Sequence, residues 1–369
     1  MRNSFYSKIL ILAGAFLAGL PSSDLIAQTY RIMPLGNSIT RGTMCTNGSI
    51  SSCVNISDED AIGFRDVLFD MLTTGGYDFD FVGSEDAGGS VMTDTDHAGF
   101  PGIRDHQLAS VMETGFSFYT GTVTPGPYLE SYPADIILLH IGTNDILAAD
   151  YTVTGVERIL DAIDDFEISY GNPIMVFLAR IISTQGNPCN SDAGVIAFNS
   201  NLDAMAASRI ASGDKLIVVD MECGAGLDYT ADMIDQVHPN QSGYDKMGTA
   251  WNDAVDAYLS MIPDSPTGLT LDGETSNSIN LSWIDNASNE TGYQIERSET
   301  SLGGDFAVIH TTGQDATTYT SNGLLEETQY FYRVRAINGS GASLYTSVES
   351  ATTLPSPPSA PTGLSATAI

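Results

Sequence analysis

Four short stretches of the chain carry residue types that together could perform acyl transfer. They are LGNSIT with Ser38, HAGFPGIRDHQL with Gly102, LLHIGTND with Asn144, and DQVHPNQSGY with Asp235 and His238. A serine hydroxyl becomes a nucleophile when a base takes its proton, and neutral imidazole can do this near neutral pH. The D-x-x-H spacing can bring the Asp235 carboxylate to the His238 ring and orient it. We therefore expect Ser38 as nucleophile, His238 as general base and Asp235 as its partner.

The reaction also needs hydrogen-bond donors aimed at the oxyanion of its tetrahedral intermediate. The backbone N–H groups of Ser38 and Gly102 and the side-chain amide of Asn144 are the candidate donors. Each motif has a purely structural alternative, because serine and glycine favour turns and Asn144 could cap a helix. The combination indicates a catalytic site more strongly than any one motif. Three neighbouring residues are candidates to line its pocket: Asn37, His97 and Arg104.

Strands and helices must alternate between about residues 30 and 261 to position these groups. The expected strands are 31–35, 79–83, 135–141, 174–181 and 216–221, and the expected helices include 61–73, 154–166 and one from about Gly243. This alternation predicts an α/β fold with a parallel sheet covered on both faces. Such sheets bind ligands at the carboxyl ends of their strands. Ser38 and Asn144 each follow an expected strand end, so the sheet can bring them to one edge.

After residue 262 the pattern changes to short alternating runs separated by turn residues. PDSPTGLT is typical of a linker and strand start, and the runs 279–283, 293–298, 306–309 and 330–337 predict an all-β immunoglobulin-like sandwich. LLEETQYFYRVRAINGSG resembles the tyrosine corner and following strand of a fibronectin type III domain. SPTGLT at 265–270 recurs as APTGLS at 360–365, which indicates the start of a second, truncated repeat.

The four blocks resemble those of the SGNH hydrolases, also called the GDSL esterase/lipase superfamily. The resemblance covers about residues 30–260 and implies the same roles for Ser38, Gly102, Asn144, Asp235 and His238. The stretches RIMPLGNSITRG, HAGFPGIR and DIILLHIGTND are similar to carbohydrate esterase family 3, which contains acetyl xylan esterases. The family implies a flavodoxin-like three-layer α/β/α fold and no metal or other cofactor. Asn37 departs from the family pattern, which has Asp before the nucleophile.

The N-terminal stretch MRNSFYSKILILAGAFLAGL has a basic start and an apolar run shorter than the roughly 20 residues of a membrane span. This pattern is typical of a secretory signal. We expect a signal peptide over 1–27, an SGNH hydrolase domain over 28–262 and a fibronectin type III domain over 263–354. Residues 355–369 would form a linker and the start of the second repeat. The protein is then secreted, extracellular or periplasmic, without membrane insertion after signal removal.

The formal net charge is −32, from 14 basic and 46 acidic residues. Such a charge repels nucleic acid and anionic membranes, so neither is an expected partner. The acidic residues are scattered along the chain, which is typical of a solvated surface. The sequence does not indicate an oligomeric state.

The chain contains four cysteines, Cys45, Cys53, Cys189 and Cys223. An even number in an exported protein favours disulfides, and proximity favours Cys45–Cys53 and Cys189–Cys223 among the three possible pairings. A zinc site is the alternative, but no C-x-x-C motif or matching histidine spacing supports it.

The combined expectation is a secreted serine esterase that cleaves short acyl groups, in the first place acetyl, from a polysaccharide such as xylan. One alternative is the same chemistry on lipid, aryl or cell-wall glycan esters. Another is a non-catalytic carbohydrate-binding or adhesion protein in which the sandwich domain carries the function. The G-x-S-x-G and S-x-x-K signatures do not occur at Ser38, and the sequence contains no P-loop or dinucleotide-binding fingerprint.

Overall fold

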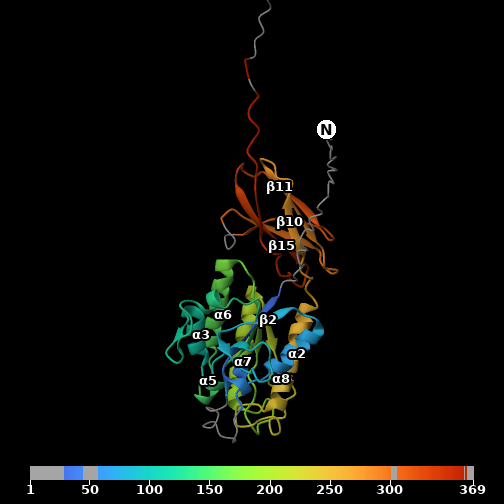
Figure 1. The fold of residues 1–369 in the computed structure, drawn as a ribbon. Helices are drawn as coiled ribbons and strands as arrows, with labels where there is room; N and C mark the ends of the chain where they lie inside the picture. Colours follow the sequence, from blue (N-terminus) through green and yellow to red (C-terminus); the bar gives the residue numbers. More distant parts are fainter. Residues whose placement is uncertain (1–28, 45–56, 301–305, 361, 364–369) are drawn as a thin grey trace, which may run out of the picture.

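The computed structural model describes residues 29–44, 57–300, 306–360 and 362–363, which form an α/β unit followed by a β-sandwich (Figure 1). The expected signal peptide, Cys45, Cys53 and most of the expected second repeat lie outside these residues. Within the described ranges, no helix combines the length and the apolar character needed to span a membrane.

The α/β unit is built on one seven-stranded sheet. Its strands and those of a small hairpin are β1 (Tyr30–Gly36), β2 (Phe79–Phe81), β3 (Glu85–Asp86), β4 (Asp96–Gly99), β5 (Phe116–Ser117), β6 (Gly121–Thr122), β7 (Ile136–His140), β8 (Met175–Ala179) and β9 (Leu216–Val219). The order is β3-β4-β1-β7-β8-β9, and β2 also pairs with β1. All pairs are parallel except β3 with β4, and β5 pairs with β6 as the separate hairpin.

Helices cover both faces of this sheet. They are α1 (Ser38–Arg41), the 3-10 helix η2 (Asp58–Asp60), α2 (Arg65–Gly75), α3 (Asp105–Thr114), α4 (Tyr128–Ser131), α5 (Thr143–Leu147), α6 (Thr154–Tyr170), α7 (Ala193–Ser212) and α8 (Gln241–Leu259). α2 and α8 pack on one face, and α3, α6 and α7 on the other (Figure 1). β7 is buried throughout, because its alternate side chains enter the two cores. The predicted three-layer α/β/α fold is confirmed.

The second unit consists of two antiparallel sheets packed face to face. Its strands are β10 (Thr267–Asp272), β11 (Ser278–Ile284), β12 (Gly292–Ser298), β13 (Ala307–Thr311), β14 (Thr318–Asn322), β15 (Gln329–Ile337) and β16 (Glu349–Thr352). One sheet has the order β10-β11-β14 and the other β13-β12-β15-β16. The Tyr330 hydroxyl accepts the Leu325 N–H at 2.9 Å, as a tyrosine corner does. The predicted immunoglobulin-like sandwich is confirmed.

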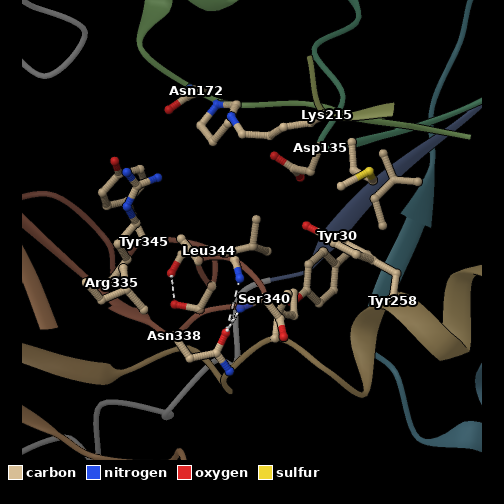
Figure 2. A pocket seen from close by; sticks show the side chains of 18 of the residues that line it. Tyr30, Asp135, Asn172, Lys215, Tyr258, Arg335, Asn338, Ser340, Leu344 and Tyr345 are labelled. Atoms are coloured by element: carbon tan, nitrogen blue, oxygen red, sulfur yellow. Dashed lines mark hydrogen bonds between the residues drawn. The ribbon is translucent and has the colours of Figure 1, made fainter. Parts of the chain in front are cut away.

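The two units contact each other at the amino ends of the parallel strands. Arg333 of the sandwich donates to the side chain of Asn172 at 3.0 Å and to the carbonyl of Gly171 at 3.3 Å. A cavity of about 460 Å³ lies beside this contact (Figure 2). Side chains of both units line it, among them Tyr30, Lys215, Tyr258, Arg335 and Tyr345. Because these are the amino ends of the strands, the cavity is at the opposite end of the sheet from Ser38.

Candidate active site

Three neighbouring strands of the sheet end at the candidate site. Gly36, the last residue of β1, lies opposite the last residues of β4 and β7 in the parallel registers. Ser38, Gly102 and Asn144 follow these three strand ends by two, three and four residues. The fold therefore brings the three residues to one edge of the sheet, where parallel sheets place their ligands.

Ser38 is the first residue of α1, which begins directly after β1. The Oδ1 atom of Asn37 accepts the N–H of Ile39 at 2.9 Å and so caps this helix. A Cβ atom at Gly36 would lie 2.2 Å from the carbonyl oxygen of His140, so only glycine allows β7 to approach here. The turn thus presents Ser38 at a helix start, whose first N–H groups have no partner within the helix.

Ser38, His238 and Asp235 form a continuous hydrogen-bonded chain. The Oγ atom of Ser38 lies 2.8 Å from Nε2 of His238, and Nδ1 of His238 lies 2.9 Å from Oδ2 of Asp235. All three residues are buried. Asp235 and His238 come from the loop before α8, which Asn240 caps by accepting the N–H of Gly243 at 3.1 Å. Residues 200 positions apart in the sequence are in this way brought into direct contact.

The Asp235 carboxylate fixes the position and the tautomer of the imidazole. Its Oδ1 atom accepts the backbone N–H groups of Val237 and His238 at 2.8 and 2.7 Å. Burial opposes the charge on Asp235, but the hydrogen bonds from the His238 ring and from these N–H groups lower the pKa of the carboxyl below its usual value. An ionised carboxylate can only accept, so Nδ1 of His238 carries the proton and Nε2 offers its lone pair to Ser38. This arrangement can support nucleophilic acyl transfer.

The loop that carries Gly102 is joined to α5, which carries Asn144. The side-chain amide of Asn144 donates to the carbonyl of Ile103 at 2.8 Å, which leaves its second N–H outside that bond. Gly102 has φ +81°, and a Cβ atom there would lie 2.1 Å from the Tyr119 hydroxyl oxygen. This backbone therefore requires glycine. The oxyanion-binding roles of Ser38, Gly102 and Asn144 stay predictions.

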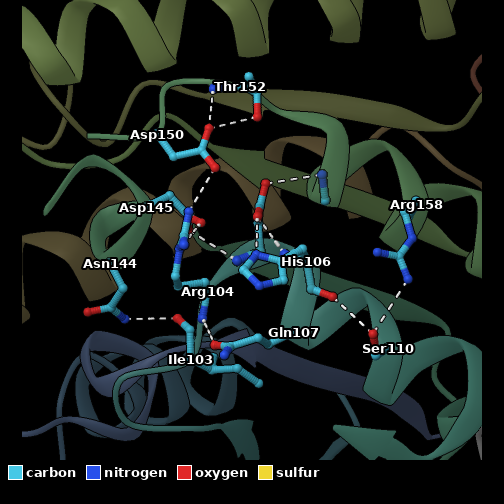
Figure 3. A network of polar contacts seen from close by, with 12 residues as sticks. Ile103, Arg104, His106, Gln107, Ser110, Asn144, Asp145, Asp150, Thr152 and Arg158 are labelled. Atoms are coloured by element: carbon cyan, nitrogen blue, oxygen red, sulfur yellow. Dashed lines mark hydrogen bonds and ion pairs between the residues drawn. The ribbon is translucent and has the colours of Figure 1, made fainter. Parts of the chain in front are cut away.

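Arg104, at the N-cap of α3, forms ion pairs with α5 and with the segment that follows α5 (Figure 3). Its Nε atom donates to Asp145 at 3.0 Å, and its Nη2 atom donates to Asp150 at 2.7 Å. Asp145 is fully buried and also accepts the N–H of Asp105 at 3.1 Å. Burial and the neighbouring Asp105 carboxylate raise the pKa of Asp145 above its usual value. Arg104, predicted as a pocket-lining residue, thus holds the start of α3 to α5 and to the segment after α5.

One group near the site could hold a metal ion, since Asp105, His106 and Asp145 place one ligand atom each within 4.8 Å of one another. All four oxygen atoms of the two carboxylates already accept hydrogen bonds from protein N–H groups. The guanidinium of Arg104 also contributes a positive charge beside Asp145. These contacts describe an internal polar network that a cation would have to disrupt. A second such group in the sandwich consists of Asp285, Glu290 and Asp315.

The other two predicted pocket residues, Asn37 and His97, are buried beneath the site. The Nδ1 atom of His97 accepts the N–H of Gly99 at 2.9 Å. Burial, helped by the charges of Arg65 and Arg41, lowers the pKa of His97 well below its usual value, so the ring is neutral. Both side chains shape the backbone around Ser38 from within the protein.

Cys189 and Cys223 are free thiols in the structure, so the bond predicted between them is not formed there. The two thiols nevertheless interact. Burial, the Cys189 thiol and the charge of Glu222 raise the pKa of Cys223 to about 12. The pairing of these two cysteines stays a prediction, and so does that of Cys45 with Cys53.

Sequence reasoning missed Asp145 and Tyr119 as contributors to the site. The sequence does contain a signal for the first, because Asp145 directly follows Asn144 and Arg104 lies two residues after Gly102. Opposite charges beside two blocks of one site favour an ion pair. Tyr119 has no such signal, since its contact with Gly102 depends on the path of the hairpin β5–β6.

Two family models match the chain. The model for GDSL-like lipase/acylhydrolase matches residues 32–251, and the model for the fibronectin type III domain matches residues 264–353. The first match covers more than half of the chain. These findings confirm both resemblances that the sequence motifs indicated.

The chain is also similar to individual proteins. It is 32% identical over 266 residues to a multidomain esterase of Ruminococcus flavefaciens, covering 68% of this chain and 32% of that protein. This chain therefore spans about a third of the length of that relative. A family 3 carbohydrate esterase of Clostridium thermocellum is 24% identical, with 63% of this chain and 98% of that chain covered and a TM-score of 0.47. One from Talaromyces cellulolyticus is 20% identical, with 63% and 99% covered and a TM-score of 0.46.

Proposed function

The chain belongs to the GDSL-like lipase/acylhydrolase family, and from this premise we propose that it is a carboxylic ester hydrolase acting through an acyl-enzyme on Ser38. The observation that carries the proposal is the hydrogen-bonded chain from Ser38 through His238 to Asp235, with both distances below 3 Å. A serine in an ordinary turn has no need of a buried imidazole that is itself oriented by a buried carboxylate.

The reaction begins when Oγ of Ser38 attacks the acyl carbon while Nε2 of His238 takes its proton. The carbonyl oxygen becomes an oxyanion, and the N–H groups of Ser38 and Gly102 and the amide of Asn144 stabilise it. The intermediate collapses, and His238 returns the proton to the leaving alcohol. Water, activated by the same imidazole, then attacks the acyl-enzyme and releases the acid. Asp235 stays ionised throughout and stabilises the imidazolium that forms twice in the cycle.

We further propose that the substrate is a short acyl ester, in the first place acetyl, on a polysaccharide such as xylan, and that the protein is exported. The similarity of three motifs to carbohydrate esterase family 3 supports the substrate. The signal-like N-terminus supports export. The net charge of −32 supports a neutral polymer over an anionic lipid surface.

Replacing Ser38 by Ala tests this function. We expect wild type to release acetate from acetylated xylan and to cleave an aryl acetate, and Ser38→Ala to lose both activities. Ser212→Ala is a matched control, because Ser212 is an exposed serine at the end of α7. Equal activity of Ser38→Ala and wild type would refute the nucleophile. Activity of wild type on the aryl ester alone would refute only the polysaccharide substrate.

A further inference from the structure

A short hairpin beside the candidate site exposes three aromatic side chains. β5 and β6 form this hairpin, and the exposed fractions are 39% for Phe116, 100% for Phe118 and 51% for Tyr119. The rings of Phe116 and Phe118 lie 5.4 Å apart in an edge-to-face arrangement. Single exposed apolar residues are common, but an exposed aromatic cluster often marks a binding surface. We call these three residues the aromatic hairpin.

The aromatic hairpin is attached directly to the loop that carries Gly102. The Tyr119 hydroxyl donates to the carbonyl of Pro101 at 2.7 Å, and its oxygen occupies the space where a Gly102 side chain would begin. At the other end of this loop, the N–H of Phe100 donates to the carbonyl of Gly36 at 2.9 Å. Gly36 is two residues before Ser38. The aromatic hairpin is therefore connected to the backbone next to Ser38 through the Gly102 loop and two hydrogen bonds.

An open groove of about 420 Å³ runs along the same loop. Hydroxyl groups are frequent in its lining, which includes Ser84, Thr120, Thr122, Tyr119 and Tyr132 together with the ring of Phe100. Hydroxyls can donate and accept, and they match the hydroxyls at the rim of a sugar ring. Exposed aromatic faces match the apolar C–H face of the same ring, because the face of the π-system is negative and the C–H groups are weakly positive.

The negative charge of the protein restricts the kinds of polymer that can bind at this groove. Among the described residues that line the groove, Glu85 is the one with a charged side chain, and the full sequence has a formal net charge of −32. An anionic lipid or an anionic polymer would be repelled. A neutral, hydroxyl-rich polysaccharide is not repelled in this way.

We propose that the aromatic hairpin and the groove bind the sugar rings that flank the acylated residue of a neutral polysaccharide. This inference rests on the proposed esterase function, because it takes Ser38 as the place where the acyl group lies. Phe118 is its most sensitive residue, since its side chain is wholly exposed and contributes little to the core. The binding energy gained on distant rings would favour polymeric esters over small ones.

The first experiment measures kcat/KM on acetylated xylan and on a small aryl acetate. We expect the ratio of the two values to fall about tenfold in Phe118→Ala, the size of effect that removal of an aromatic anchor produces. Phe118→Tyr, which keeps the ring, should restore most of the ratio. Ile168→Ala is the matched control, because Ile168 is an exposed apolar residue on α6. A ratio in Phe118→Ala within twofold of wild type would overturn the inference.

A second experiment measures binding without turnover. Ser38→Ala and Ser38→Ala/Phe118→Ala are compared by affinity electrophoresis in gels that contain acetylated xylan. We expect retardation of the first variant and about tenfold weaker retardation of the second. Equal retardation, or retardation by neither, would overturn the inference even if ester hydrolysis is confirmed. Retardation that depends on Phe118 in a protein without esterase activity would instead refute the proposed function and leave the sugar-binding surface standing.

Discussion

Replacement of Asp235 by Asn tests whether the tautomer of His238 controls the reaction. In the wild-type structure, Oδ1 of Asp235 accepts the backbone N–H groups of Val237 and His238, while Oδ2 faces the ring. An asparagine side chain has a single oxygen atom. We expect that oxygen to keep accepting the N–H groups of Val237 and His238. Its NH2 group is then directed at Nδ1, which must act as an acceptor, so the ring proton moves to Nε2.

The size of the effect follows from this geometry. An Nε2–H group 2.8 Å from the Oγ atom of Ser38 cannot take the serine proton. The oxyanion donors and substrate contacts are unaffected. A triad that keeps its geometry but holds the wrong tautomer loses a factor of about 10⁴ in kcat, which corresponds to about 5.4 kcal/mol.

The assay is the kcat of Asp235→Asn on an aryl acetate, with thermal unfolding as a check on the fold. Asp161→Asn is the control, because Asp161 is exposed and lies on α6, far along the chain from the triad. A folded Asp235→Asn variant within tenfold of the wild-type kcat would refute the tautomer argument.

The same variant provides a test of the lowered pKa of Asp235. A carboxyl whose pKa is lower in the folded state contributes stability above its unfolded pKa of about 3.9, and loses this contribution as the pH falls through the folded value. The melting temperature of wild type should therefore exceed that of Asp235→Asn at pH 6, and the difference should shrink below pH 3.9. A difference that grows on acidification would show that the pKa is raised.

Three further substitutions test other contacts. Gly102→Ala forces a Cβ to within 2.1 Å of the Tyr119 hydroxyl at φ +81°, so kcat should fall at least tenfold; an unchanged kcat would remove Gly102 from the site. Arg104→Ala should lower kcat about 100-fold with a smaller change in KM, and Arg104→Lys should restore only part of it; a change confined to KM would contradict a positioning role. Asn172→Ala removes one of the two acceptors that Arg333 has in the α/β unit and should lower the free energy of unfolding by about 1 kcal/mol in denaturant titrations, whereas no loss would show that this hydrogen bond contributes nothing.

The core of the sheet was predictable because its central strands are nearly continuous apolar runs. The expected strands 31–35, 79–83, 135–141, 174–181 and 216–221 correspond to β1, β2, β7, β8 and β9, with differences of a few residues at their ends. β4, with the sequence DHAG, was not expected as a strand. Aspartate and glycine disfavour strands, and this segment is held in the sheet by its pairing with β1 and β3. A tertiary contact of this kind leaves no periodic pattern in the sequence.

The candidate site divides in the same way. Ser38, Asp235 and His238 could be predicted from the sequence, because together with the Gly102 and Asn144 motifs they supply a nucleophile, a base, an orienting acid and oxyanion donors, which are a chemically defined set. The supporting contacts could not be predicted in this way. Arg104 binds Asp145, which is 41 residues away in the sequence, and the sequence alone does not indicate which of the many acidic residues lies beside Arg104. Tyr119 is similar, since its hydroxyl acts on the Gly102 loop through a hydrogen bond to a backbone carbonyl.

The hydrogen bonding of Asn37 shows why the site can have asparagine, where the family pattern has aspartate, directly before the nucleophile. Its Oδ1 atom caps α1 by accepting the Ile39 N–H, and Asn and Asp are equally good at this position. The cap that orients Ser38 is thus retained. In the fully buried environment of Asn37, a carboxylate would require compensation for a desolvated charge. The amide instead leaves Nδ2 without a hydrogen-bond partner in the described part of the chain, at a cost of about 1–3 kcal/mol. The geometry of Ser38 therefore depends on the oxygen that both residues share, and the charge that only aspartate carries is dispensable for it.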